Sequence, residues 1–153
     1  MLNIYVKNCT FRLLTNTIYN MNSKTFLIAG IVGGIVNWLL GWLFYGILFA
    51  DFFTQPKDSI KTMVCILLGC LTFGLFISYI YNRWAQISTA KTGAKYGAII
   101  GIFMGLIANF FNIPFIKGLT YAVIATDISI TVVMTVITGA VIGVLSGKLN
   151  ANN

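Results

Sequence analysis

Long apolar stretches without charge alternate with short polar segments along this chain. Four stretches stand out: Lys24 to Asp51, Lys61 to Arg83, Lys95 to Lys117, and Lys117 to Lys148, the last interrupted only by Asp127. A helix needs about 20 apolar residues to cross the hydrocarbon core of a bilayer. The pattern therefore predicts transmembrane helices over Thr25–Phe49, Thr62–Tyr81, Tyr96–Ile116 and Thr120–Leu145.

The polar segments between these stretches predict how the helices are connected. Asp51–Ile60, which contains Pro56, is typical of an aqueous turn, and Arg83–Lys95 is the most polar inner segment. Only Lys117–Leu119 separates the third and fourth stretches, so those helices must be antiparallel neighbours. We expect an all-α fold, an antiparallel bundle of four transmembrane helices over residues 25–147, followed by a short cytoplasmic tail over residues 148–153.

The first residues of the chain leave two interpretations open. Residues 1–24 form a cytoplasmic segment, and residues 1–20 are either disordered or an amphipathic helix at the membrane interface. Alternatively, Met21 is the true start, because MNSK followed by an apolar span is a normal opening for a membrane protein.

Charge and composition set the environment and the orientation. Only 8% of the residues are charged, against about 25% in soluble domains. Lysine and arginine accumulate on the cytoplasmic side of membrane proteins. One predicted side carries Lys7, Arg12, Lys24, Arg83, Lys91, Lys95 and Lys148, and the other carries Lys57, Lys61 and Lys117. Both termini should therefore be cytoplasmic, in a multi-pass protein of the plasma membrane, which is the inner membrane of a bacterium.

The same distribution bears on the partners of the chain. The basic residues lie between apolar stretches instead of forming the stripe that a phosphate-binding face needs, so we expect no nucleic acid. The lipid bilayer is the main partner, with a second copy of the chain or a membrane complex as further possibilities. Aromatic residues near the predicted boundaries, Tyr45, Tyr79, Trp84, Tyr96 and Tyr121, fit interfacial belts.

Glycines recur at a spacing of four residues in the predicted helices. The third helix carries Gly93, Gly97, Gly101 and Gly105, and the fourth carries Gly139, Gly143 and Gly147. In the first helix, four glycines lie within about 60° of Asn37 around the helix axis: Gly30, Gly33, Gly34 and Gly41. Small residues let helix backbones approach closely in lipid. We therefore expect a glycine zipper between the third and fourth helices, and Asn37 facing the bundle or a second copy.

Asp127 is the one acidic residue that the pattern places within a span. Thr131 and Thr138 lie within about 40° of it around the helix, and Asn109 lies at a similar depth in the third helix, where it can bond to Asp127. An intramembrane carboxylate is a functional-site candidate by default. The alternative is that the fourth helix begins at Asp127, with the carboxylate capping its N-terminus in the headgroup region.

The remaining chemistry of the sequence is sparse. There is no histidine, and Cys65 and Cys70 point to different faces of one helix. Neither a metal-ligand cluster nor a nucleophile with an identifiable base emerges, so we expect no enzyme and no cofactor. We expect a non-enzymatic bundle that acts through packing or as an accessory subunit. The alternative is a small dimeric transporter coupled to protons or cations through Asp127.

Three segments resemble a known family. They are GGIVNWLLGWLFYGILFADFF in the first helix, GAKYGAIIGIFMGL in the third and DISITVVMTVITGAVIGVL in the fourth. Together they look like the helices of a family of small four-helix integral membrane proteins from bacteria and fungi, a domain of unknown function. The resemblance covers most of residues 26–147 and implies a fold and a membrane location, without implying an activity.

Overall fold

The computed structural model of the chain describes residues 23–55, 59–116 and 120–151, and most of these residues are helical. The elements are α2 (Ser23–Gly41), which continues as the π-helix η1 (Trp42–Leu48), α3 (Ile60–Tyr79), which continues as the π-helix η2 (Ile80–Ala85), α4 (Ala90–Asn112) and α5 (Tyr121–Ala151). Among these residues, 4 helices are long and apolar enough to cross a membrane. The expected all-α fold with four potential spans is therefore confirmed, whereas the N-terminal segment lies almost wholly outside the described residues.

The third helix differs most from its predicted bounds. It runs from Ala90 to Asn112, not from Tyr96 to Ile116. Thr89 is extended, and its side-chain hydroxyl accepts a hydrogen bond from the Thr92 backbone N–H at 3.3 Å, which caps the helix early. At the other end the helix stops before Pro114: Ile113 keeps αR geometry, but proline has no backbone N–H with which to continue the hydrogen-bond ladder.

Other helices also continue beyond the charged residues that were used to predict their ends. The second span continues to Ala85 and includes Arg83, and the fourth continues to Ala151 and includes Lys148. Long basic side chains can run along a helix and place their charge at the bilayer surface. Charged residues are therefore a better guide to where a helix leaves the hydrocarbon core than to where the helix itself ends.

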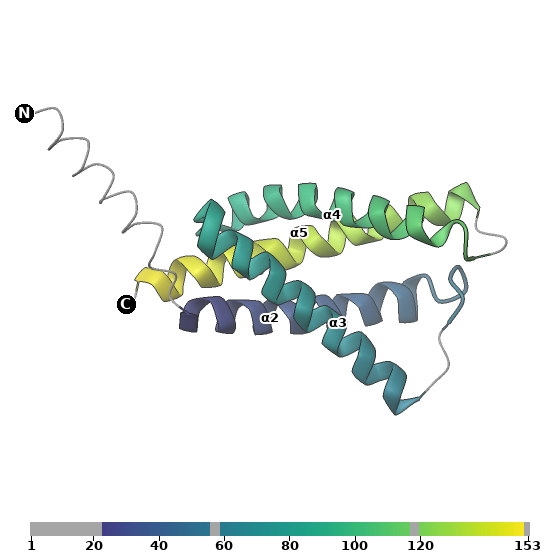
Figure 1. The fold of residues 1–153 in the computed structure, drawn as a ribbon, viewed down its shortest axis with the longest axis horizontal. Helices are drawn as coiled ribbons and strands as arrows, with labels where there is room; N and C mark the ends of the chain where they lie inside the picture. Colours follow the sequence, from purple (N-terminus) through teal and green to yellow (C-terminus); the bar gives the residue numbers. More distant parts are fainter. Residues whose placement is uncertain (1–22, 56–58, 117–119, 152–153) are drawn as a thin grey trace, which may run out of the picture.

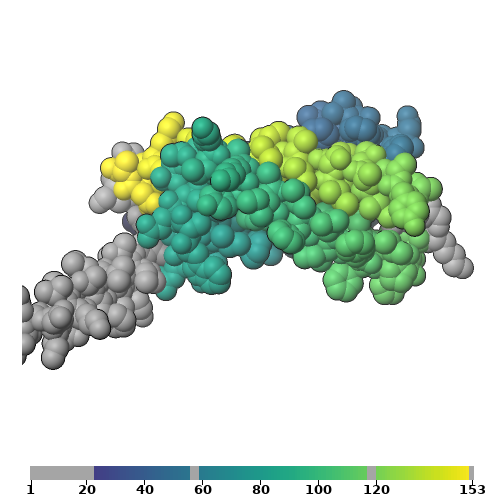
Figure 2. Space-filling view, turned by 90° about the horizontal axis from the view of Figure 1, so that it is seen from above, coloured from purple at the N-terminus to yellow at the C-terminus, as the bar shows by residue number. Residues whose placement is uncertain are grey.

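The helices form two antiparallel pairs that meet along one seam (Figure 1). α3 packs mainly on α2, α4 packs mainly on α5, and α2 packs on α5 to join the pairs. The end of the bundle that holds Ser23 and Ala151 is called the terminal end, and the end that holds residues 49–55 and Tyr121 is called the opposite end. In Figure 2, α4 and α5 form one closely packed surface along the bundle.

Glycines bring the backbones of α4 and α5 into contact. A Cβ atom built on Gly93 would meet the Gly139 carbonyl oxygen, and one built on Gly97 would meet the Thr135 carbonyl oxygen. A Cβ atom on Gly101 would lie 2.9 Å from the Val132 Cα atom. No side chain fits at these positions, so the pair depends on glycine for its close approach.

The remaining glycines of the predicted zipper extend this contact in both directions. A Cβ atom on Gly105 would lie 3.3 Å from the Ile128 Cα atom, and one on Gly143 would lie 2.5 Å from the Thr89 carbonyl oxygen. Gly147 lies against the Ser88 carbonyl oxygen. The end of α5 therefore packs directly on the segment that leads into α4.

A shorter glycine contact joins α2 to α3. Gly74 lies against the Gly30 carbonyl oxygen and the Gly34 backbone nitrogen, and a Cβ atom on Gly34 would lie 2.7 Å from the Leu71 Cα atom. Gly41 is different, because its nearest neighbour would be the Met134 Cε atom at 3.5 Å, an ordinary side-chain contact. Close approach between α2 and α3 is thus confined to the middle and the terminal end.

The first half of α3 leaves the bundle. In Figure 1, α3 crosses α2 obliquely, and its N-terminal half extends away from the other helices. Ile60 is 86% exposed and Leu68 is 57% exposed. A Cβ atom on Gly69 would have nothing within 4 Å. The buried apolar cluster lies instead towards the terminal end and consists of Ala29, Ile77, Tyr81, Ile87 and Ile142.

Candidate functional site: a carboxylate shared by three helices

Asp127 lies inside α5 and does not cap it. The helix begins at Tyr121, which places Asp127 about 9 Å further along the axis. The Thr120 hydroxyl accepts a hydrogen bond from the Val123 backbone N–H at 3.4 Å, so a different residue serves the first turn. The alternative in which Asp127 caps the fourth helix is therefore wrong, because the apolar segment Tyr121–Ala125 is itself helical.

Two neutral groups hold the Asp127 carboxylate. The Tyr45 hydroxyl donates to Oδ1 at 2.7 Å, and the Asn109 side-chain Nδ2 donates to Oδ2 at 2.6 Å. The bond that the sequence predicts between Asn109 and Asp127 is thus present, and Asn109 is only 5% exposed. Because the three residues come from η1, α4 and α5, the carboxylate joins three helices.

Asn109 has a fixed orientation. Its Nδ2 also donates to the Gly105 backbone carbonyl at 2.9 Å, so the same nitrogen serves two acceptors. Turning the amide over would place its oxygen against both acceptors. Asn109 therefore presents a donor to the carboxylate, and not a ligand oxygen.

Tyr45 reaches the site because the helix changes geometry at Trp42. In the π-helix η1, the Phe49 backbone N–H bonds to the Phe44 carbonyl at 2.8 Å, five residues back. Such segments change the angular position of the side chains and are frequent at functional sites. From its place in the sequence Tyr45 is expected in an interfacial belt, and apolar periodicity carries no signal for the π-helix that brings it to this site.

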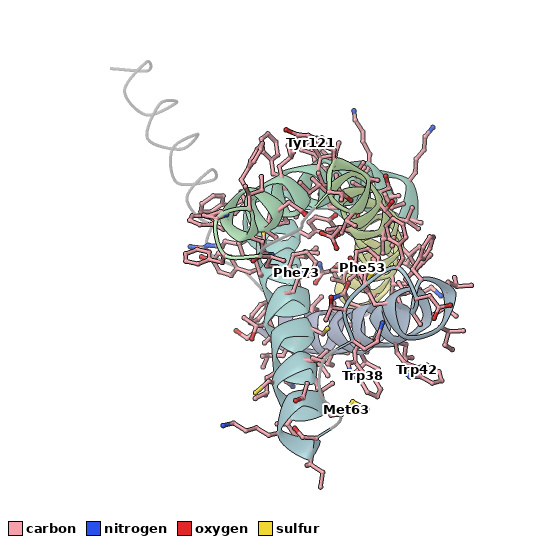
Figure 3. The ribbon with its side chains drawn as sticks, turned by 90° about the vertical axis from the view of Figure 1, so that its right-hand side faces the viewer. Trp38, Trp42, Phe53, Met63, Phe73 and Tyr121 are labelled. Carbon is pink, nitrogen blue, oxygen red and sulfur yellow. The ribbon has the colours of Figure 1, made fainter. Side chains whose placement is uncertain are left out.

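The segment after η1 covers Tyr45. Gln55 Nε2 donates to the backbone carbonyls of Tyr45, Ala50 and Phe53 at 3.1, 2.8 and 3.2 Å. The Phe53 ring meets the Tyr45 ring edge-on with centroids 5.0 Å apart. In the end-on view of Figure 3, Phe53 lies over the middle of the helix assembly. One glutamine thus fixes the loop that places an aromatic ring beside the site.

The two α5 threonines that the sequence places on the same helix face as Asp127, Thr131 and Thr138, belong to two different polar sites. The Thr131 side chain lies near the Tyr45 hydroxyl and therefore belongs to the Asp127 site. Thr138 is fully buried and donates to the Asn37 Oδ1 at 3.4 Å, and Asn37 is 8% exposed. Asn37 also contacts the Cys70 thiol. The structure thus places Asn37 inside the bundle with Thr138, as a second polar pair separate from Asp127.

A third polar cluster, which the sequence analysis missed, lies at the terminal end. Asn82 Nδ2 donates to the hydroxyls of Ser78 at 3.2 Å and Ser146 at 3.0 Å. The Ser78 hydroxyl donates to the Phe26 carbonyl at 2.8 Å, and the Tyr81 hydroxyl donates to the Gly93 carbonyl at 2.6 Å. Small polar residues within apolar spans were the available signal, but their partners lie far away in sequence.

The Asp127 site combines negative charge with uncharged neighbours. Both hydrogen bonds to the carboxylate come from neutral donors, which stabilise the charge without neutralising it. Such a group can take up a proton or bind a cation. Because its hydrogen-bond partners lie on η1 and α4, either event would change the contacts among three helices. The chain matches no protein-family model, no curated protein and no solved structure.

Proposed function

We propose that this small membrane protein is a cation carrier in which Asp127 binds and releases a proton or another cation. In this proposal it works without chemical transformation of its substrate, in the plasma membrane, with both termini on the cytoplasmic side. Since four helices are few for a complete pathway, the working form would be a dimer.

The observation that carries this proposal is the pair of hydrogen bonds to Asp127. A carboxylate inside an apolar helix is costly unless it is hydrogen-bonded. Tyr45 and Asn109 supply those bonds at 2.7 and 2.6 Å from two other elements. A change in the charge of Asp127 would alter contacts with η1 and α4 together, which is what coupling between binding and helix movement requires.

The interior polar groups offer further support. Asp127 with Tyr45, the pair Asn37 and Thr138, and the cluster around Asn82 follow one another from the opposite end of the bundle towards the terminal end. Polar side chains on the inner faces of membrane helices commonly mark ion and proton pathways. The buried residues Met134 and Ile142 lie between these groups on α5, so a pathway would need the helices to move apart.

The test is transport by the purified protein in liposomes. Proton, sodium and potassium fluxes are measured after a pH gradient or a sodium gradient has been imposed. The wild type should carry at least one of these ions above the level of protein-free liposomes. Asp127→Asn should lower the flux at least tenfold, because it removes the charge and keeps the shape.

A matched control separates this effect from a general change of charge. Asp51 is exposed in the turn after η1 and is not placed in the site, so Asp51→Asn should transport like the wild type. Equal flux in Asp127→Asn and the wild type, with both correctly folded, contradicts the proposal. Absence of any gradient-driven flux in the wild type also contradicts it.

A second candidate function, a packing or accessory role in a membrane assembly, is favoured by one observation. The first half of α3 has few contacts inside the chain, and Gly69 faces open space there. A second copy of the chain bound to this half of α3 would give it the neighbours that α2 gives to the other half. Such an assembly is compatible with a dimeric carrier and does not require one.

A further inference from the structure

The aromatic residues beside Asp127 bear on what the carrier binds. Tyr45 and Phe53 meet edge to face with centroids 5.0 Å apart, and Phe53 and Phe52 meet in the same way at 5.5 Å. The interplanar angles are 65° and 77°. In an edge-to-face contact the edge of one ring lies on one face of the other, and the face of a ring is the negative part of its quadrupole.

The ligand oxygens at the site fit a bare metal ion poorly. Calcium takes about 6–8 oxygen ligands, and magnesium requires near-ideal octahedral geometry. Asn109 presents its nitrogen, which is already bonded to Gly105 and Asp127. The remaining side-chain oxygens at the site are those of Asp127, Tyr45 and Thr131. Calcium or magnesium would therefore depend on backbone carbonyls or solvent for most of its coordination.

One carboxylate with several aromatic rings suits a different class of cation. A substituted ammonium or phosphonium ion spreads one positive charge over an apolar surface, so it needs a single counter-charge and apolar or aromatic walls. Asp127 supplies the charge, and Tyr45, Phe53 and Phe52 supply rings that continue outwards from it. Phe52 is 45% exposed, so this row of rings extends to the surface at the opposite end.

We infer that the Asp127 site accepts a lipophilic organic cation, held by the carboxylate and by the rings of Tyr45 and Phe53. This inference rests on the proposed function and specifies its substrate class. A proton is the natural competitor, because protonation of Asp127 removes the counter-charge. Gln55 holds the loop that carries Phe53, so the aromatic part of the site is formed before a ligand arrives.

The test is equilibrium binding of radiolabelled tetraphenylphosphonium to the full chain in lipid nanodiscs, with uptake by empty nanodiscs subtracted. The wild type should bind in a saturable manner, and Asp127→Asn should abolish saturable binding. Phe53→Leu should weaken binding roughly 3- to 10-fold, in the range of a lost cation–π contact. A tenfold excess of unlabelled tetraphenylphosphonium should compete, whereas sodium chloride at the same concentration should not.

Two controls make the result specific. Phe111 is 70% exposed on α4, so Phe111→Leu removes a ring elsewhere and should bind like the wild type. Tetraphenylborate has the same shape and the opposite charge, and its uptake should be equal in the wild type and in Asp127→Asn. Equal tetraphenylphosphonium binding in those two proteins overturns the inference.

The transport and binding assays can fail independently. If gradient-driven flux depends on Asp127 but tetraphenylphosphonium does not bind in a saturable manner, the proposed carrier function stands and the inference of an organic cation is overturned. If sodium displaces tetraphenylphosphonium, the site belongs to a metal ion, and the inference of an organic cation is again overturned. If Asp127→Asn changes neither flux nor binding, both the proposed function and the inference are wrong.

Discussion

The hydrogen bond between Tyr45 and Asp127 connects two helices that lie far apart in the sequence. It joins η1 to α5 between residues 82 positions apart, at a donor–acceptor distance of 2.7 Å. Hydrogen bonds to charged groups stabilise more than neutral ones, although side-chain bonds between membrane helices average only about 0.6 kcal/mol. We therefore expect this bond to a carboxyl group to contribute more than that average.

Tyr45→Phe tests the contribution of this bond to stability. The substitution removes the hydroxyl and keeps the ring that packs on Phe53. We expect the free energy of unfolding to fall by about 1–2 kcal/mol, measured by reversible unfolding in mixed micelles. Tyr121→Phe is the control, because Tyr121 is 90% exposed. A loss no larger in Tyr45→Phe than in the control would show that the bond adds nothing to stability.

At the level of elements, the glycines make the α4–α5 pair intolerant of larger residues. A Cβ atom on Gly97 would meet the Thr135 carbonyl oxygen, whose position is fixed by the helix backbone. On α3, Gly69 has nothing within 4 Å. The two glycines sit in comparable helical environments and differ in what faces them, which makes them a matched pair.

Gly97→Ala should destabilise the protein and Gly69→Ala should not. Overpacking a close contact costs about 1–3 kcal/mol, whereas alanine in an exposed helix position is favoured over glycine by up to about 1 kcal/mol. The midpoint of thermal unfolding should therefore fall for Gly97→Ala and stay level or rise for Gly69→Ala. Equal shifts for the two variants would mean that the backbones of α4 and α5 do not need this approach.

The helical elements were predictable because lipid imposes long uncharged stretches, and the spacing of charges in the sequence reveals them. Their exact ends were not, since caps such as Thr89 act locally, beyond the edges of the apolar pattern. The bond from Asn109 to Asp127 followed from helix geometry in a short hairpin. Tyr45 did not, because the π-helix that places it and the distance to its partner leave no trace in periodicity.

At the scale of the whole molecule, the first half of α3 stands out because it packs on few other residues of the same chain. The helix has the length to span a membrane, yet only its later half packs against α2. Lipid can cover apolar side chains there, but a second copy can do so as well, and α3 would then lie at the centre of a dimer. Cys65 is an exposed free thiol in this half and can report on such contact.

Oxidative cross-linking through Cys65 tests the dimer. In a protein that also carries Cys9→Ser and Cys70→Ser, copper phenanthroline should produce a disulfide-linked dimer in native membranes. Cys65→Ser should remove that dimer. A cysteine placed instead at Phe103, which is 62% exposed on α4, should not cross-link. Equal cross-linking from both positions would indicate random collision, and none from Cys65 would exclude this interface.

The glycine contacts between α4 and α5 also bear on how the protein withstands removal from lipid. Where Gly93 and Gly97 lie against the carbonyls of Gly139 and Thr135, each Cα–H group can act as a weak donor, worth about 0.5–1 kcal/mol. These bonds are internal to the pair and do not depend on the surrounding acyl chains. Extraction into harsh detergent should therefore loosen the α2–α3 hairpin first, while α4 and α5 remain joined as a folded remnant.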